Sequence, residues 1–301
     1  MYPELAFEEH RTAKLVADRL NSIGISVEKS VGKTGVVGTL TGKNNGPTIA
    51  LRADMDALPM QETGDISYKS KNDGVMHACG HDGHVAMLLG AAEILTAKKD
   101  ELQGTVKFIF QPAEEGLGGA RFMIEDGALE GVDEIYGIHL WNYQKSGTVG
   151  IKPGPIMAAA DGFELTIFGK GGHGAAPQGT QDAVVIAAHL IQSLQTIVSR
   201  NTNPIESTVV TVGKINGGYN FNIIADKVTL SGTTRAHSEE NRQLIKSRMR
   251  DIISGTEKMF NCRIELDYMD GYPPTLNDPD CADKLLSAAQ KIVGEGAGEP
   301  Y

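Results

Sequence analysis

The sequence predicts an α/β protein in which a layered, mostly parallel sheet domain is followed by an inserted α+β domain. As far as Leu140, helical patterns alternate with short, almost wholly apolar strands, which is typical of a buried parallel sheet. Beyond Pro153-Gly154-Pro155 the strands alternate apolar and polar residues and the helices are longer. The order of these later elements, β-α-β-β-α-β, is that of a ferredoxin-like domain.

The composition narrows the class of protein. The 301 residues exceed the roughly 250 at which a single core usually stops growing, so we expect two domains. The 28 Lys and Arg against 38 Asp and Glu give a net charge of −10, which argues against a nucleic-acid partner. Three widely spaced cysteines suit a reducing compartment. The most apolar run, Ala183 to Leu190, is short, and Met1 to Glu9 have neither a basic start nor an apolar stretch. We therefore expect a soluble, cytoplasmic protein without a membrane partner.

The elements of the first domain follow from hydrophobic spacing. Residues from Glu9 to Ile23 predict a helix that ends at Gly24. Two apolar runs, Val36 to Leu40 and Thr48 to Ala53, predict strands, and the Asn45-Gly46 step between them favours a tight turn that would pair them. The later patterns predict a helix from His84, a strand over Val106 to Phe110, a helix over Gly118 to Glu125 and a strand over Glu134 to Leu140.

The second domain is predicted in the same way. Its strands are expected over Phe163 to Phe168, Ser207 to Ile215, Ile223 to Thr234 and Arg263 to Tyr268, and its helices over Asp182 to Val198 and Ser238 to Phe260. Ser238, followed by two glutamates, predicts a helix N-cap. A further helix is expected over Pro279 to Val293.

Three groups of residues could carry catalytic chemistry. The densest is His77-Ala78-Cys79-Gly80-His81-Asp82-Gly83-His84, whose thiol and imidazoles are zinc-class ligands; the alternative is a loop of solvated histidines around an inert Cys79. The second is Glu114-Glu115. Neighbours in an extended segment point in opposite directions, so one acid could bind metal while the other faces the reacting water, although most such pairs are solvated. The third is His139, a core residue unless its strand end shares the crevice of the other two.

These residues resemble the amidohydrolase branch of the aminoacylase and carboxypeptidase G family of di-metal exopeptidases. That branch includes hippurate hydrolases, N-acyl amino acid amidohydrolases and plant indoleacetyl amino acid hydrolases. The other matching motifs are Pro3-Glu4-Leu5 with Glu8-Glu9, Arg52-Ala53-Asp54-Met55-Asp56-Ala57-Leu58-Pro59, Gly169-Lys170-Gly171-Gly172-His173-Gly174-Ala175-Ala176-Pro177 and Gly232-Thr233-Thr234-Arg235. The resemblance runs from residue 3 to about residue 278. It implies a metallopeptidase-like catalytic domain over 1–159, an inserted lid and dimerisation domain over 160–271, and a return to the catalytic domain from 272 to 301.

The resemblance also implies a metal site. Cys79 would bridge two divalent metal ions, His81 and His139 would complete one site, and Glu115 would belong to the other. Glu114 would then be the general base.

Further roles are implied for residues around that site. Asp56 would fix a ligand histidine, although an Asp that caps a turn at a strand end is an alternative. His173 would reach the active site of the partner subunit and help to hold the oxyanion. Arg235 and Asn222 would face the substrate carboxylate, and the alternative for both is a place on the lid surface.

The implied reaction is hydrolysis of an N-acyl amino acid, with an acetyl, benzoyl or similar acyl group, by a homodimer that carries two Zn, Mn or Co ions per subunit. One alternative is a dipeptidase or aminopeptidase of the same clan. The other is a catalytically impaired fragment or homologue that acts as a dimerising ligand-binding module. No histidine follows His237, whereas the family supplies a last histidine ligand after the lid. The resemblance therefore predicts a fragment or a shortened gene product whose second metal site lacks that ligand.

Overall fold

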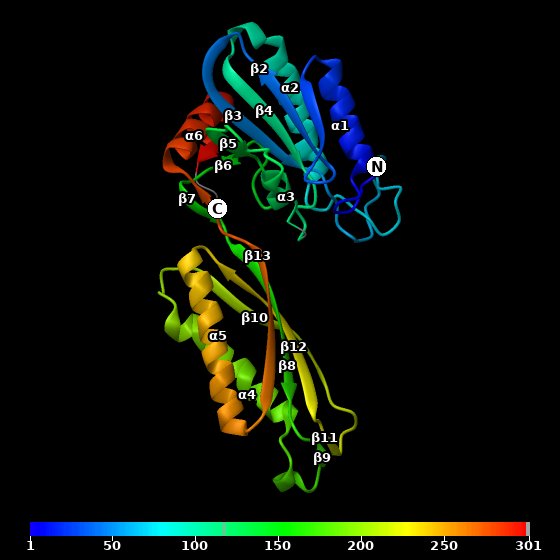
Figure 1. Cartoon of the computed structure of the whole chain (residues 1–301), viewed down its shortest axis with the longest axis vertical. Helices are drawn as coiled ribbons and strands as arrows, with labels where there is room; N and C mark the ends of the chain where they lie inside the picture. The colour runs from blue at the N-terminus through cyan, green and yellow to red at the C-terminus, as the bar shows by residue number, and fades with distance from the viewer. Residues whose placement is uncertain (117, 299–301) are drawn as a thin grey trace. The chain divides into compact units, whose positions relative to one another are not determined.

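The structure is a computed structural model that describes residues 1–116 and 118–298. The chain divides into two compact units, Met1–Lys145 and Ser146–Tyr301, and Figure 1 labels most of their helices and strands. The limits of 160 and 271 for the inserted domain stay a prediction.

The first unit is built on one mixed sheet with the strand order β1-β2-β4-β3-β5. The strands are β1 (Ser26–Val31), β2 (Gly35–Thr41), β3 (Asn44–Asp54), β4 (Gln103–Gln111) and β5 (Glu134–Gly137), and the helices are α1 (His10–Ser22), α2 (His81–Ala97) and α3 (Gly119–Glu125), with a short 3₁₀ turn at Lys99–Glu101. Strand β3 is parallel to both β4 and β5, whereas β1 with β2 and β2 with β4 are antiparallel. The α/β class is confirmed, and this sheet is mixed rather than mostly parallel.

Successive residues of a strand point to opposite sides of the sheet. In this sheet the residues on both sides are buried against helices. On one face Phe108 and Phe110 of β4 pack with residues of α1 and α2 such as Leu20 and Leu88. On the other face Ile109 packs with Met123 of α3. Burial on both faces explains why the central strands are apolar almost throughout.

The predicted pairing of the strands at Val36 and Thr48 is wrong. Strand β4 lies between β2 and β3, which do not contact each other through ladder hydrogen bonds. The residues expected to form the turn continue as the start of β3, where Asn44 is opposite Gln103 and Thr48 is opposite Thr105. The irregular register is accommodated at Gly104, which has a φ of +83° and where a Cβ would approach Pro47 O to 2.0 Å. The residues of a turn do not reveal that a strand from much later in the chain, β4, is inserted between the two strands that the turn joins.

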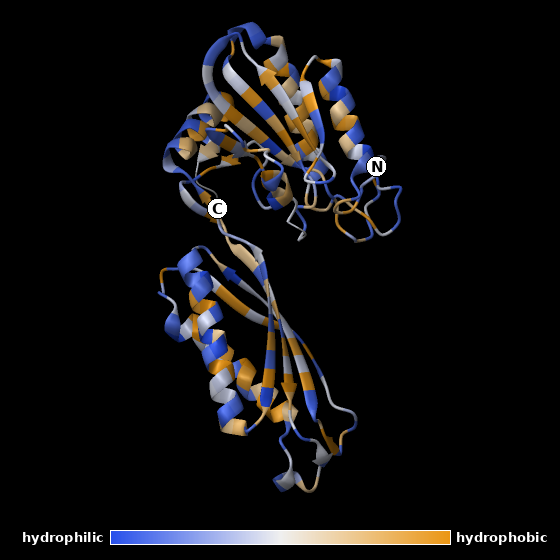
Figure 2. Cartoon of the chain, viewed as in Figure 1, coloured by the Kyte–Doolittle hydropathy of each residue, from blue (hydrophilic) through white to orange (hydrophobic). Residues whose placement is uncertain are grey.

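The second unit contains an antiparallel sheet with the order β10-β12-β8-β13. Along the chain its elements are β8 (Ala159–Phe168), α4 (Ala183–Thr196), β10 (Thr208–Gly217), β12 (Lys227–Ala236), α5 (Glu239–Phe260) and β13 (Arg263–Tyr272). This is the predicted β-α-β-β-α-β order. Along the strands hydrophobic residues alternate with hydrophilic ones (Figure 2). Ser238 is the N-cap of α5 and accepts a hydrogen bond from Asn241 N–H at 3.2 Å, as predicted.

Shorter elements complete this unit. They are β6 (Val149–Gly150), β7 (Gly154–Met157), β9 (Gly172–His173), β11 (Ile223–Ile224), β14 (Thr275–Asn277), α6 (Pro279–Val293) and β15 (Ala297–Gly298), with helical turns at Pro177–Gly179, Ile197–Asn201 and Gly294–Gly296. The strand expected from Ile223 to Thr234 is therefore split between β11, which pairs with β9, and β12.

One stretch of the described residues, Ala183–Asn201, is long and apolar enough to cross a membrane by length and composition. Its Ile186, Leu190 and Leu194 are buried in the core of the antiparallel sheet. The packing of this helix against the sheet accounts for its apolar character without a membrane.

Candidate metal centre

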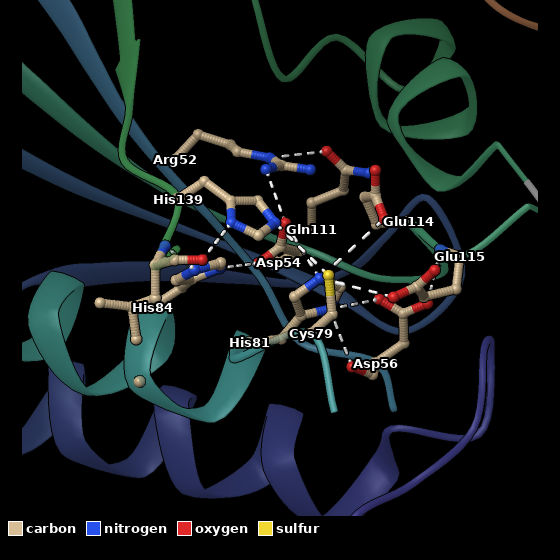
Figure 3. A network of polar contacts seen from close by, with 12 residues as sticks. Arg52, Asp54, Asp56, Cys79, His81, His84, Gln111, Glu114, Glu115 and His139 are labelled. Carbon is tan, nitrogen blue, oxygen red and sulfur yellow. Dashed lines mark hydrogen bonds and ion pairs between the residues drawn. The ribbon is translucent and has the colours of Figure 1, made fainter. Parts of the chain in front are cut away.

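The predicted catalytic cluster lies at one edge of the five-stranded sheet (Figure 3). Asp54 is the last residue of β3, Glu114 follows the end of β4, and His81 is the first residue of α2. Strand β5 ends at Gly137, earlier than expected, so His139 lies in the loop that follows. Because β3, β4 and β5 are parallel, their carboxyl ends meet at the same edge.

Two imidazole rings are held through their Nδ1 atoms. His81 Nδ1 lies 2.9 Å from the backbone oxygen of Asp56 and 3.2 Å from its Oδ1. His139 Nδ1 lies 2.6 Å from the backbone oxygen of Leu140. In the neutral rings each Nδ1–H donates to these oxygens, which leaves the lone pair of the ring on Nε2. Backbone or carboxylate partners hold metal-binding histidines in this same way.

The ligand atoms of the residues predicted from the sequence fall into two overlapping groups. The atoms of Cys79, His81 and His139 lie within 4.8 Å of one another, and so do those of His81, Glu114 and Glu115. Cys79 Sγ is 3.4 Å from His139 Nε2. His81 is common to both groups, which brings all five residues into one cluster.

The two glutamates converge, contrary to the expectation that they point in opposite directions. Glu114 Oε2 and Glu115 Oε1 each lie 3.9 Å from His81 Nε2. The segment is not extended, because the buried Ala113 has a φ of +50° and Gly116 N–H donates to Glu114 O at 2.7 Å. A left-handed alanine costs about 1–3 kcal/mol, so surrounding contacts must hold it.

Asp54 and His84 also belong to the cluster, and neither was assigned a role from the sequence. His84 Nδ1 donates to Asp54 Oδ1 at 2.5 Å, and His84 Nε2 accepts from Leu140 N–H at 2.8 Å. Both nitrogens of His84 are therefore engaged, so it positions Asp54 and the loop of His139. Arg52 donates to the second oxygen of Asp54 at 2.7 Å. The sequence signal that could have placed His84 in the cluster was its spacing from His81, which puts both residues on one helix face.

The residues fit a bound cation. His81 Nε2 and Glu115 Oε1 are buried and have no hydrogen-bond partner among the described residues. The carboxylate oxygens of Asp54 and Glu114 lie 3.6 and 3.9 Å from His81 Nε2, beyond hydrogen-bond distance. Unpaired buried polar atoms are costly, and a divalent ion between them would satisfy both. Sulfur, imidazole and carboxylate together are a transition-metal donor set.

The pKa shifts within the cluster also indicate a site for cations. Burial, and then the negative charges of Glu115 and Glu114, raise the pKa of Cys79 to about 12. Burial followed by the charges of Glu115 and Asp54 raises the pKa of Glu114. Burial alone would lower the pKa of His81, but its hydrogen bond to Asp56 and the charge of Asp54 raise it overall. The excess of negative charge favours cations.

Burial also disfavours charge on two other groups. It raises the pKa of Asp54, but the hydrogen bond from His84 and the charge of Arg52 outweigh it and hold the pKa well below the ordinary value. Burial, with the nearby charge of His84, lowers the pKa of His139. Asp54 is thus an anion and His139 a neutral imidazole near pH 7.

The three remaining predicted site residues lie in the second unit. His173 in β9 pairs with Ile223 of β11, and the backbone oxygen of Asn222 accepts from Gly174 N–H at 2.9 Å. His173 and Asn222 line one hollow of about 610 Å³. Arg235, on β12, donates to Thr234 O at 2.8 Å and to Thr233 Oγ1.

Known proteins resemble this chain over most of its length. The model of peptidase family M20/M25/M40 matches residues 50–300. Thermostable carboxypeptidase 2 of Saccharolobus solfataricus is 45% identical over 298 residues, which cover 97% of this chain and 76% of that protein. Hippurate hydrolase of Campylobacter jejuni is 43% identical over 295 residues, which cover 97% and 76%. The crystal structure of the Bacillus subtilis YXEP protein, a dinuclear metal binding peptidase from the M20 family, has a TM-score of 0.83 at 36% identity and covers 97% of this chain and 76% of its own.

Proposed function

This chain belongs to the peptidase family M20/M25/M40, and from that premise we propose that it is a metal-dependent hydrolase of the amide bond in N-acyl amino acids. The reaction releases a carboxylic acid, such as acetic or benzoic acid, and a free amino acid. The observation that carries the proposal is the buried, unpartnered His81 Nε2 among the oxygens of Asp54, Glu114 and Glu115. It gives this chain a donor set suited to a metal, in a family of amide-bond hydrolases.

We assign the parts of the site as follows. Cys79, His81, His139 and Glu115 would hold the two metal ions, with zinc, manganese and cobalt as candidates. Such ions supply polarisation of the amide carbonyl and a lower pKa for the attacking water. Glu114 accepts the proton of that water and returns it to the leaving amine.

The second unit contributes substrate recognition in this proposal. Arg235 and Asn222 bind the substrate carboxylate, and His173 of the partner subunit donates to the oxyanion of the tetrahedral species. The chain accordingly acts as a homodimer formed through the domain over 160–271. Its three cysteines are free and form no pairing framework, which suits a cytoplasmic enzyme.

Removal of metal is expected to abolish hydrolysis. Dialysis against a chelator should lower turnover of N-benzoylglycine about 1,000-fold or more, because both carbonyl polarisation and water activation are lost. Addition of Zn²⁺, Mn²⁺ or Co²⁺ should restore it. The measurement is metal content by mass spectrometry alongside release of glycine from N-acetyl and N-benzoyl substrates.

The cysteines provide a matched control for this experiment. Cys79→Ser should lower metal content and turnover together, whereas Cys281→Ser, in the first turn of α6, should change neither. Full turnover of a preparation that contains less than about a tenth of an equivalent of metal would contradict the proposal.

The carboxylate-binding role of Arg235 predicts a change in KM. Arg235→Gln should raise KM for an N-acyl amino acid about 10- to 100-fold, because a charge-assisted pair is lost. The same variant should bind the corresponding amino acid amide, which has no carboxylate, as the unaltered enzyme does. An equal rise of KM for both substrates would show that Arg235 acts on something other than the carboxylate.

A further inference from the structure

Glu9 is a buried acid that the proposed mechanism does not use. It immediately precedes α1, and its side chain is 0% exposed. Its Oε1 accepts hydrogen bonds from Phe7 N–H at 3.0 Å and Ala113 N–H at 2.8 Å, and its Oε2 accepts one from the Thr34 hydroxyl at 2.5 Å. Among the described residues no ion pair to Glu9 occurs. Burial of a carboxylate that accepts hydrogen bonds only from neutral donors lowers the stability of the fold. This cost suggests that Glu9 has a specific role.

The hydrogen bond from Ala113 N–H connects Glu9 to the metal centre. Ala113 is the buried residue with a φ of +50°, and it directly precedes Glu114 and Glu115. Glu115 N–H in turn donates to Asp56 Oδ2 at 2.9 Å. Two carboxylates therefore fix the backbone that carries both glutamates. Glu9 holds it at Ala113, just before the pair, and Asp56 holds it at Glu115.

We infer that Glu9 is a positioning residue, which holds Ala113 in its left-handed conformation and thereby aims Glu114 and Glu115 at His81. Without the Glu9 acceptor, Ala113 relaxes toward an ordinary backbone conformation. Neighbouring side chains of such a segment diverge, and the two carboxylates no longer converge. The inference rests on the proposed function for its kinetic consequence but not for its effect on metal binding.

The simpler explanation is that Glu9 only fastens the start of the chain to the turn between β1 and β2. Thr34 lies in that turn and donates its hydroxyl hydrogen to Glu9. Thr34→Val is therefore a matched control. The substitution removes the hydroxyl donor to Oε2 and leaves the contact with Ala113 in place. A purely structural Glu9 predicts that Glu9→Leu and Thr34→Val behave alike at equal loss of stability.

The test compares these variants of the whole chain by hydrolysis of N-benzoylglycine and by Co²⁺ titration followed through the absorption of the cobalt–thiolate chromophore. We expect Glu9→Leu, which has no acceptor for Ala113 N–H, to lower kcat about 10- to 100-fold with KM within about twofold. It should also weaken Co²⁺ binding about 10-fold. Thr34→Val should change neither quantity more than about twofold.

A second substitution tests the backbone step itself. Glycine adopts a positive φ without steric cost, so Ala113→Gly introduced into Glu9→Leu should recover most of the lost kcat and cobalt affinity. If Glu9→Leu does not fold by circular dichroism, Glu9→Asp, which keeps the charge and is shorter by one methylene, replaces it in the same series.

The outcomes separate the two proposals. Equal behaviour of Glu9→Leu and Thr34→Val, or no recovery with Ala113→Gly, overturns the positioning role. If the unaltered chain hydrolyses no N-acyl amino acid, the proposed function fails, and the cobalt titration alone still decides the role of Glu9.

Discussion

Replacement of Glu114 by glutamine is expected to lower kcat about 100- to 10,000-fold while leaving the metal content unchanged. The amide has the size of the carboxylate but cannot accept the proton of the attacking water. Glu114 Oε2 lies 3.9 Å from His81 Nε2, close enough to the candidate metal ligands to act on a water held among them. The measurement is kcat for N-benzoylglycine together with metal content for each preparation.

Glu115→Gln is the matched control for this variant. Glu115 Oε1 is buried and lacks a hydrogen-bond partner among the described residues, as expected of an atom whose partner is a metal ion. Its substitution should therefore lower metal content as well as kcat. Turnover within a few fold of the unaltered enzyme in Glu114→Gln would remove Glu114 from the role of base, and loss of metal in both variants would make both glutamates ligands.

Much of the fold was predictable because its elements are set by local periodicity. The helix expected from Glu9 to Ile23 is observed as His10–Ser22, and the helix expected from Pro279 to Val293 has those limits. Strand order was less accessible, since the insertion of β4 between β2 and β3 depends on contacts between residues about 60 positions apart. The helix predicted from His84 begins at His81 because Gly80, with a φ of +91°, starts it one turn earlier.

The cluster of site residues was predictable because a sheet collects side chains at its strand ends. Cys79, His81 and His139 lie together as the sequence suggested. What the sequence did not reveal is which side chains are already engaged. His84 resembles His81 in the motif, yet both of its nitrogens have protein partners, and only the structure distinguishes the two. The convergence of the glutamates likewise depends on the backbone of Ala113, and no local pattern indicates a positive φ at an alanine.

The second unit contains a buried ion pair, and its removal is expected to cause the largest loss of stability. Asp161 on β8 is 3% exposed and accepts from Arg242 at 2.9 and 2.6 Å, from Tyr268 Oη at 3.0 Å and from Gly271 N–H at 2.8 Å. Asp161→Asn leaves Arg242 buried without its main counter-charge. Breaking a buried pair in this way costs about 3–5 kcal/mol of the free energy of unfolding. Weaker contacts of Arg242 with Glu239 and Asp270 favour the lower end.

The pH dependence distinguishes loss of the charge from a change of packing. Burial raises the pKa of Asp161, but its hydrogen bonds from Arg242 and Gly271 outweigh this effect and lower the pKa below the ordinary value of 3.8. A carboxyl whose pKa is lower in the folded state stabilises the protein above its unfolded-state pKa, and this contribution disappears as the pH falls through the folded-state pKa. The stability difference between the unaltered chain and Asp161→Asn should therefore be constant from about pH 8 to 5 and shrink below about pH 4.

Urea unfolding followed by far-ultraviolet circular dichroism measures this difference, because the single tryptophan, Trp141, lies in the first unit and does not report on the second. Glu164→Gln is the control, since Glu164 lies on the same strand with an exposed side chain and should change stability by less than about 0.5 kcal/mol. A difference for Asp161→Asn that persists unchanged at pH 3 would assign the loss to altered packing around Arg242. The shrinking difference is expected instead, because protonation of Asp161 removes from the unaltered chain the same charge that the asparagine lacks.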